Sequence, residues 1–237
     1  MRPIDRLIVA LDVNSEDRAV ALADKLKNDV KFFKIGLELF SSCGPQIVDR
    51  IKETGCDIFL DLKFHDIPTT VAKAAAAVTK LKPFMFNVHA LGGYDMMKRT
   101  AEAVADEARR LDIVKPRILA VTILTSLDEK ALKDTGVGGG PKEAVLRLAR
   151  LAKKAGLDGV VASPSETRHI RQEVGDDFLI VTPGIRPGWA AAGDQKRTAT
   201  PNAAVKDGAD YIVVGRPITE STDPAEAARE ILKAMEI

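Results

Sequence analysis

The sequence is poor in cysteine and in aromatic side chains. It contains two cysteines, Cys43 and Cys56, thirteen positions apart, and phenylalanine, tryptophan and tyrosine together make up 5% of its 237 residues. Two cysteines at this spacing match neither the disulfide framework of a small secreted domain nor the ligand spacing of a zinc site. We therefore expect both thiols to be reduced and structural.

An excess of charge of either sign is also missing. The chain has 35 lysines and arginines and 34 aspartates and glutamates, a formal net charge of +1, and basic residues do not gather in a run. Binding to nucleic acid or to an anionic membrane surface normally requires a basic patch. We therefore expect neither partner.

Long apolar runs are absent as well. The amino terminus carries no apolar stretch of signal-sequence length, and charged residues interrupt the later apolar stretches before they could cross a membrane. The expected location is therefore the cytoplasm.

Sequence motifs for metal and Walker-type phosphate sites are lacking too. His65, His89 and His169 form neither an H-x-H nor an H-E-x-x-H pattern, so we expect hydrogen-bonded structural roles for them and no metal. The glycine-rich stretch 136–140 precedes Lys142, but a glutamate follows this lysine where a Walker-type loop has serine or threonine. We interpret this stretch as an ordinary loop.

What the sequence does have is eight short apolar runs that alternate with longer amphipathic stretches. This alternation is typical of repeated βα units, and nearly continuous apolar runs indicate strands that are covered on both faces. A (β/α)8 TIM barrel needs about 250 residues, close to this length. An open doubly wound sheet would show the same local pattern, but length and strand number favour one barrel domain over residues 1–237. The expected strands are 7–12, 31–36, 57–62, 84–89, 117–122, 159–162, 179–182 and 211–214.

Charged residues stand where several of these strands are expected to end. Asp12 and Lys34 lie at the ends of the first two strands, Asp61 and Lys63 close the third, and Asp66 follows. Barrel active sites lie at the carboxyl ends of the strands, and residues two apart on a strand point to the same face. A solvated charge run is the alternative interpretation. The direct continuation from an apolar strand favours a functional cluster.

Two later loops carry the residue types of a phosphate site. Gly184 and Arg186 follow the seventh expected strand, and Gly215 and Arg216 follow the eighth. Many barrels hold phosphate in these two loops, where glycine admits backbone N–H groups and arginine binds the anion bidentately. The sequence therefore predicts a phosphorylated small-molecule substrate.

The stretch 189–200 between these loops is polar and rich in small residues. It is long enough to act as a closing lid, with Gln195 and Arg197 as candidate contacts.

Together these motifs closely resemble the orotidine 5′-monophosphate decarboxylase family, nearly from end to end. The most specific is Asp-x-Lys-x-x-Asp-Ile-Pro at 61–68. The resemblance implies a carboxy-lyase of pyrimidine biosynthesis that converts orotidine 5′-monophosphate to uridine 5′-monophosphate and carbon dioxide without a cofactor. The other matching motifs are Leu11-Asp12, Phe33-Lys34-Ile35-Gly36, Asn87-Val88-His89-Ala90, Thr182-Pro183-Gly184-Ile185-Arg186 and Val214-Gly215-Arg216-Pro217-Ile218.

The resemblance also implies roles for individual residues. Lys63 would donate the proton that replaces the carboxylate at C6 of the pyrimidine, within an alternating charge network of Lys34, Asp61, Lys63 and Asp66. Asp66, Ile67 and Thr70 would reach into the neighbouring subunit's site in a homodimer. The implied substrate contacts are Asp12 and Lys34 for the ribose hydroxyls, Thr125 or Ser126 for the pyrimidine edge, Gln195 for base and phosphate, Arg186, Gly215 and Arg216 for the phosphate, and Pro183 in the same loop as Arg186.

Three other functions remain open at this point. Magnesium-dependent relatives on the same barrel, such as a keto-gulonate phosphate decarboxylase or a hexulose phosphate synthase, share the Asp-x-Lys-x-x-Asp segment but place an acid where this chain has Lys34. A non-catalytic phospholigand-binding barrel is a second alternative. A Schiff-base aldolase is a third, although its lysine would be apolar and isolated, whereas Lys63 is flanked by Asp61 and Asp66.

Overall fold

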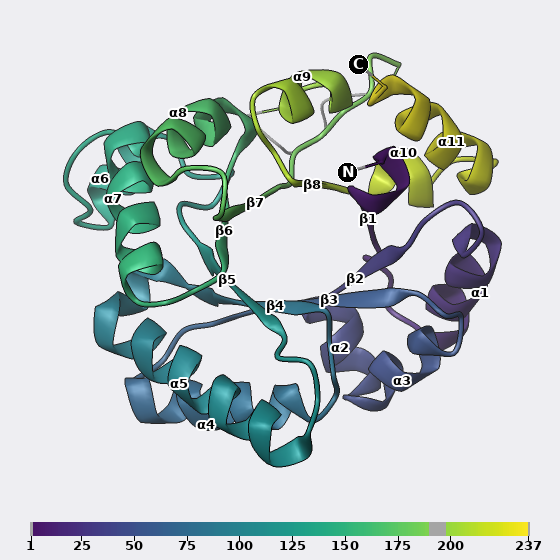
Figure 1. Cartoon of the computed structure of the whole chain (residues 1–237). Helices are drawn as coiled ribbons and strands as arrows, with labels where there is room; N and C mark the ends of the chain where they lie inside the picture. Colours follow the sequence, from purple (N-terminus) through teal and green to yellow (C-terminus); the bar gives the residue numbers. More distant parts are fainter. Residues whose placement is uncertain (1, 190–197, 237) are drawn as a thin grey trace.

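The computed structural model describes residues 2–189 and 198–236. Eight parallel strands pair in sequence order, and β8 pairs back to β1, which closes the barrel (Figure 1). This closure confirms the predicted TIM barrel over the open sheet. The strands are β1 Leu7–Ala10, β2 Phe32–Gly36, β3 Asp57–Phe64, β4 Met85–His89, β5 Arg117–Val121, β6 Gly159–Val161, β7 Leu179–Thr182 and β8 Tyr211–Val214.

Helices fill the connections between the strands and surround the ring of strands (Figure 1). Several begin with proline in the first turn, where the missing N–H leaves no helical hydrogen bond unmade. The helices are η1 Pro3–Asp5, α1 Glu16–Leu26, α2 Leu37–Cys43, α3 Gln46–Lys52, α4 Pro68–Thr79, η2 Ala90–Gly92, α5 Gly93–Leu111, α6 Glu129–Asp134, α7 Pro141–Lys154, α8 Pro164–Val174, α9 Pro201–Lys206, α10 Arg216–Thr219 and α11 Pro224–Ala234.

Four strands end at different residues from those expected: β5 and β6 each end one residue early, at Val121 and Val161, and β1 and β3 differ by two residues. β1 ends at Ala10 instead of residue 12, although the Leu11 N–H still donates to the Lys34 carbonyl. β3 continues to Phe64 instead of ending at residue 62, because its pairing with β4 resumes at Phe64 opposite Val88 after an irregularity. These differences lie at the end of the barrel where the charged residues gather.

Alternate side chains of the strands fill the barrel interior. Ile8 and Ala10 of β1, Phe32 of β2 and Phe59 of β3 are buried there, while their neighbours Val9, Phe33 and Leu60 pack outward under the helices. In each of the three strands, or directly beyond it, a charged residue stands two positions after the last buried apolar side chain that points inward: Asp12 after Ala10, Lys34 after Phe32 and Asp61 after Phe59. Charge therefore begins where the apolar filling stops.

The amino ends of the strands are closed by aromatic packing. Phe32 contacts both Phe84 and Tyr211, with ring centroids 4.8 and 5.6 Å apart. The Arg117 guanidinium lies 4.7 Å from the Phe84 centroid and donates to the Tyr211 hydroxyl at 3.0 Å. This packing fills the bottom of the barrel and leaves the opposite end for the site.

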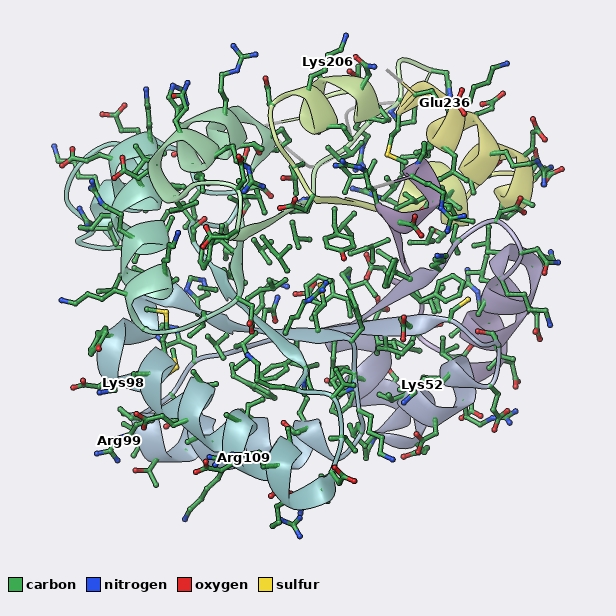
Figure 2. All side chains as sticks on the ribbon, in the orientation of Figure 1. Lys52, Lys98, Arg99, Arg109, Lys206 and Glu236 are labelled. Atoms are coloured by element: carbon green, nitrogen blue, oxygen red, sulfur yellow. The ribbon has the colours of Figure 1, made fainter. Side chains whose placement is uncertain are left out.

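Charged side chains such as Lys98, Arg99 and Lys206 project from the outer surface of the helices (Figure 2). None of the helices in the described part of the chain has both the length and the apolar character needed to cross a membrane. Cys43 and Cys56 are unpaired thiols, and Cys56 is buried.

Candidate active site

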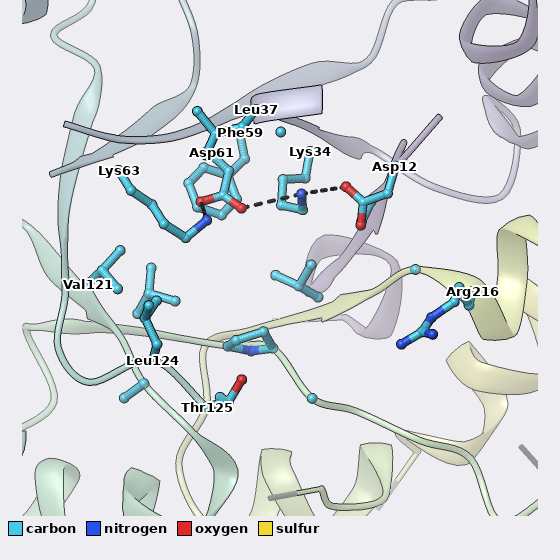
Figure 3. Close-up of a pocket in the computed structure, with 18 of the residues that line it drawn as sticks. Asp12, Lys34, Leu37, Phe59, Asp61, Lys63, Val121, Leu124, Thr125 and Arg216 are labelled. Carbon is cyan, nitrogen blue, oxygen red and sulfur yellow. Dashed lines mark hydrogen bonds and ion pairs between the residues drawn. The ribbon is translucent and has the colours of Figure 1, made fainter. Parts of the chain in front are cut away.

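A cavity of about 490 Å³ opens at the carboxyl ends of the strands. Its volume lies in the range of small-molecule binding sites. In Figure 3 the charged residues of β2 and β3 cross one side of it, and Thr125 and Leu124 lie opposite. Of the residues predicted from sequence, it brings together Asp12, Lys34, Asp61, Lys63, Thr125, Pro183, Arg186, Gly215 and Arg216.

Four of these side chains form a continuous line of alternating charge. Lys34 Nζ lies 2.9 Å from Asp12 Oδ1 and 3.3 Å from Asp61 Oδ2. The other oxygen of Asp61 accepts a hydrogen bond from Lys63 Nζ at 2.6 Å. Each lysine is therefore paired with Asp61, Lys63 and Asp12 are the two ends of the line, and all four residues line the cavity (Figure 3).

The centre of this line is buried. Lys34 is 8% exposed, and the Asp61 side chain is 13% exposed. Burial alone would lower the pKa of Lys34, but attraction to Asp61 and Asp12 outweighs it and raises that pKa above its ordinary value. Burial would raise the pKa of Asp61, but the charges of Lys34 and Lys63 lower it. Lys34 and Asp61 thus both stay ionised at neutral pH. The Lys63 side chain is 31% exposed and is therefore more accessible than that of Lys34.

Gly36 at the end of β2 makes room for the Lys34 ammonium. A Cβ atom at this position would lie 2.8 Å from Lys34 Nζ and 3.3 Å from Asp12 Oδ1. Any other residue would push the ammonium out of the line. The Phe33-Lys34-Ile35-Gly36 motif therefore has a steric basis.

Lys63 takes its place through an irregular backbone. Its φ is +50°, in the left-handed region that a non-glycine residue rarely adopts. Leu60 of β3 pairs with Phe86 of β4, and the next pair is Phe64 with Val88. Between these two pairs the chain advances by four residues on β3 but by only two on β4. The prediction that Lys63 lies beside Asp61 is confirmed, but a bulge brings them together instead of the regular alternation of a strand.

Asn87 of β4 holds this bulge, and the sequence interpretation assigned it no role. It is fully buried; its Oδ1 accepts from the Lys63 N–H and its Nδ2 donates to Asp61 Oδ1, both at 2.7 Å. The signal was present in the sequence: Asn87 stands two residues from the inward-facing Met85, a polar side chain at an interior position of an apolar strand.

The predicted phosphate end of the cavity is lined by two arginines, Arg186 and Arg216. Burial, and then the positive charge of Arg216, lowers the pKa of Arg186. Gly184 has a φ of +83°, and the Arg186 N–H donates to the Ala199 carbonyl at 2.9 Å, which anchors this loop to the chain after residue 197. Two guanidinium groups that line the same end of a cavity can bind an anion such as phosphate with charged hydrogen bonds.

Several predicted residues lie elsewhere. Ser126 is exposed and does not line the cavity, whereas Thr125 does. Asp66, Ile67 and Thr70 are exposed and do not line it either, and Asp66 Oδ1 accepts the Ile67 N–H at 2.6 Å. Gln195, Arg197 and most of the expected lid fall outside the described residues.

The histidines differ in part from expectation. His65 and His89 stack with ring centroids 5.2 Å apart, and burial, with the nearby His65 and Lys63 charges, lowers the pKa of His89 to about 4. Within residues 2–189 and 198–236, the buried Nδ1 atoms of His89 and His169 have no hydrogen-bond partner, so the expected hydrogen bonds are not made there. The same residues contain no cluster of three or more His, Cys, Asp and Glu side chains that could hold a metal ion.

The fold is a closed parallel barrel, and the cavity at its catalytic end contains both the line of lysines and carboxylates and the two arginines. These features define a barrel enzyme that acts on a small anionic substrate. The model of the Orotidine 5′-phosphate decarboxylase / HUMPS family matches residues 5–231, and the chain belongs to this family.

Relatives over the full length support the assignment. The chain is 49% identical over 238 residues, covering 100% of both chains, to orotidine 5′-phosphate decarboxylase of Syntrophomonas wolfei. It is 52% identical to that of Syntrophotalea carbinolica, over 97% of this chain and 94% of the relative. The crystal structure of orotidine 5′-phosphate decarboxylase from Lactobacillus acidophilus has a TM-score of 0.87 and 41% identity, with 98% of this chain and 100% of that chain covered.

Proposed function

We propose that this chain decarboxylates orotidine 5′-monophosphate to uridine 5′-monophosphate and carbon dioxide, the last step of de novo pyrimidine nucleotide synthesis. The observation that carries the proposal is the Lys63 ammonium, held by Asp61 at one end of a cavity whose other end presents Arg186 and Arg216. The family of the chain supports the same reaction.

The reaction needs fixed charge at the carbon that loses its carboxylate. When the C6–carboxylate bond breaks, its electron pair stays on C6 in the plane of the ring, where the π system cannot delocalise it as a pyridoxal or thiamine cofactor would. A preorganised ammonium stabilises this charge. At about 4 Å and an effective dielectric constant near 20 it contributes roughly 4 kcal/mol, or about three decades in rate.

Lys63 then completes the reaction as the proton donor. Its ammonium gives a proton to C6, forming the C–H bond of the product, and the neutral amine regains a proton from water. Asp61 keeps the ammonium aimed into the cavity, since it bonds Lys63 with one carboxylate oxygen and Lys34 with the other. Lys34 is bound by two carboxylates and Lys63 by one, so the Lys63 ammonium is the one more available to the substrate.

The remaining cavity residues fit the other parts of the nucleotide. Asp12 and Lys34 would bind the ribose hydroxyls, and Thr125 the pyrimidine edge, with Arg186, Gly215 and Arg216 on the phosphate beside Pro183. Gln195 is proposed as a contact to base and phosphate from the family resemblance alone. Binding energy from the phosphate would hold C6 against Lys63 and so contribute to kcat as well as to affinity.

We also propose that two copies of the chain share their active sites. Asp66 and Thr70 are exposed, and the apolar Ile67 is 67% exposed, yet none of the three lines the cavity of its own chain. A second copy of the chain that packs against this surface would bury Ile67 and could bring Asp66 and Thr70 to its own active site. The homodimer and the cytoplasmic location remain predictions.

A spectrophotometric assay tests the activity directly. Purified enzyme should remove the ultraviolet absorbance of orotidine 5′-monophosphate, with equimolar release of carbon dioxide, and retain this rate in a strong chelator. Loss of activity in the chelator would favour the magnesium-dependent relatives, although the Lys34 ammonium occupies the place where their acid would stand. Trapping of a substrate adduct by borohydride would indicate a Schiff-base aldolase, and binding without turnover would indicate a phospholigand-binding barrel.

A further inference from the structure

The backbone of Lys63 is held by a side chain from the neighbouring strand. Between Leu60 and Phe64 the regular β3–β4 register is interrupted, so the Lys63 N–H lies where the ladder does not continue. It donates instead to Asn87 Oδ1 at 2.7 Å. A left-handed backbone at a lysine is unfavourable and persists only when its surroundings enforce it.

The same amide also binds the carboxylate that receives the lysine side chain. Asn87 Nδ2 donates to Asp61 Oδ1 at 2.7 Å, and this oxygen accepts from Lys63 Nζ at 2.6 Å. Asn87 thus contacts Lys63 at its backbone and, through one oxygen of Asp61, at its ammonium. With Oδ1 held in this way, Asp61 Oδ2 faces Lys34 at 3.3 Å.

We propose that Asn87 is a positioning residue that fixes the direction of the Lys63 ammonium through the bulge in β3. This inference rests on the proposed function for its catalytic consequence, since it is Lys63 that would protonate C6. Asn87 itself does not line the cavity. It acts by setting the backbone conformation of Lys63 and the orientation of the Asp61 carboxylate.

A primary amide meets both demands at this position because it carries an acceptor oxygen and a donor N–H group. Aspartate could accept from the Lys63 N–H, but it could not donate to Asp61 and would place a second negative charge beside it. Leucine has a similar size and forms neither bond, so it would leave the Lys63 N–H without this acceptor. Serine is too short to reach both groups at once.

The test compares Asn87→Leu, Asn87→Asp and Asn87→Ser with Thr122→Val as a matched control. Thr122 is also fully buried, directly after β5, and its hydroxyl donates to the Val161 carbonyl at 3.1 Å and not to a residue of the charge line. For each variant we would measure kcat, the Kd for uridine 5′-monophosphate, the melting temperature and a crystal structure. Three replacements ensure that failure of one to fold does not remove the test.

The expected result is a loss in kcat that stability does not explain. Displacement of a reacting group by about 1 Å can cost about 100-fold, so each Asn87 variant that folds should lose about this much in kcat with little change in Kd. Thr122→Val should lower the melting temperature to a similar extent and keep its kcat. The crystal structures should show a changed φ at Lys63 and an ammonium that no longer bonds Asp61.

Two results would overturn the inference. One is a folded Asn87→Leu variant whose kcat stays within about tenfold of wild type, less than ~1.4 kcal/mol. The other is a crystal structure of any Asn87 variant in which the left-handed Lys63 and its bond to Asp61 persist. If wild-type enzyme fails to decarboxylate the substrate, the proposed function fails instead, and the crystal structures still decide the role of Asn87.

Discussion

Lys63 Nζ lies 2.6 Å from Asp61 Oδ1, and the backbone between them bends through a left-handed φ of +50° at Lys63 itself. The two residues are only two positions apart, so a regular strand would point both side chains away in parallel. The bend turns the ammonium back to the carboxylate and leaves it at the edge of the cavity.

Lys63→Ala should leave the fold and phosphate binding intact while removing nearly all turnover. The reason is that the other lysine lining the cavity in the described part of the chain, Lys34, is held between Asp12 and Asp61 and cannot take its place. Steady-state kinetics with circular dichroism would measure both effects, with the exposed Lys98→Ala as control. Activity within about tenfold of wild type, or less than ~1.4 kcal/mol, would remove Lys63 from the mechanism.

Arg186→Ala should lower activity through the phosphate alone. Loss of a charged hydrogen bond of about 1.5–3 kcal/mol should lower kcat/KM for the nucleotide roughly 10- to 150-fold, through kcat as well as KM, because the phosphate also helps to hold C6 against Lys63. Turnover of the phosphate-free nucleoside orotidine, although slow, should be unchanged by this substitution. An equal loss with nucleotide and nucleoside would show that Arg186 does not act on the phosphate.

Asp61→Asn should lower the free energy of unfolding at neutral pH, and the loss should be smaller at acidic pH. The substitution leaves Lys34 and Lys63 without their shared counter-charge and should cost about 3 kcal/mol at pH 7. In the wild type, burial opposes ionisation of Asp61, but Lys34 and Lys63 lower its pKa below the ordinary 3.8. The stabilisation is therefore fully present above pH 3.8 and is lost as pH falls through the folded-state pKa.

Denaturant unfolding at a series of pH values would measure this effect. The difference in unfolding free energy between wild type and Asp61→Asn should shrink as the pH is lowered below 3.8. A difference that stays constant over this range would mean that the ionised Asp61 carboxylate does not stabilise the fold.

Mixing two inactive variants should restore activity if the sites are shared. Lys63→Ala supplies an intact Asp66, and Asp66→Asn supplies an intact Lys63, so a hybrid dimer contains one complete site. Random exchange of equal amounts should recover roughly a quarter of wild-type activity, because half the dimers are hybrids with one of two sites working. Sedimentation would verify the dimer, and no recovery despite subunit exchange would refute the shared site.

Much of the fold and site could be predicted from the sequence. The inward side chains Ala10, Phe32 and Phe59 are followed two residues later by Asp12, Lys34 and Asp61, and this change along each strand places charge at the carboxyl end of a closed parallel barrel. The glycine–arginine pairs were predicted for the same end because they follow the last two strands. These features depend on residues close together in the chain, so local patterns determine them.

Other features depend on contacts between distant residues, and only the tertiary structure decided them. The choice of Thr125 over Ser126 for the cavity depends on how the loop after β5 packs. The left-handed turn of Lys63 depends on Asn87, twenty-four positions further along the chain. A propensity rule would have kept Lys63 in a regular strand, because the hydrogen bond that makes the bulge stable exists only when β3 and β4 lie side by side.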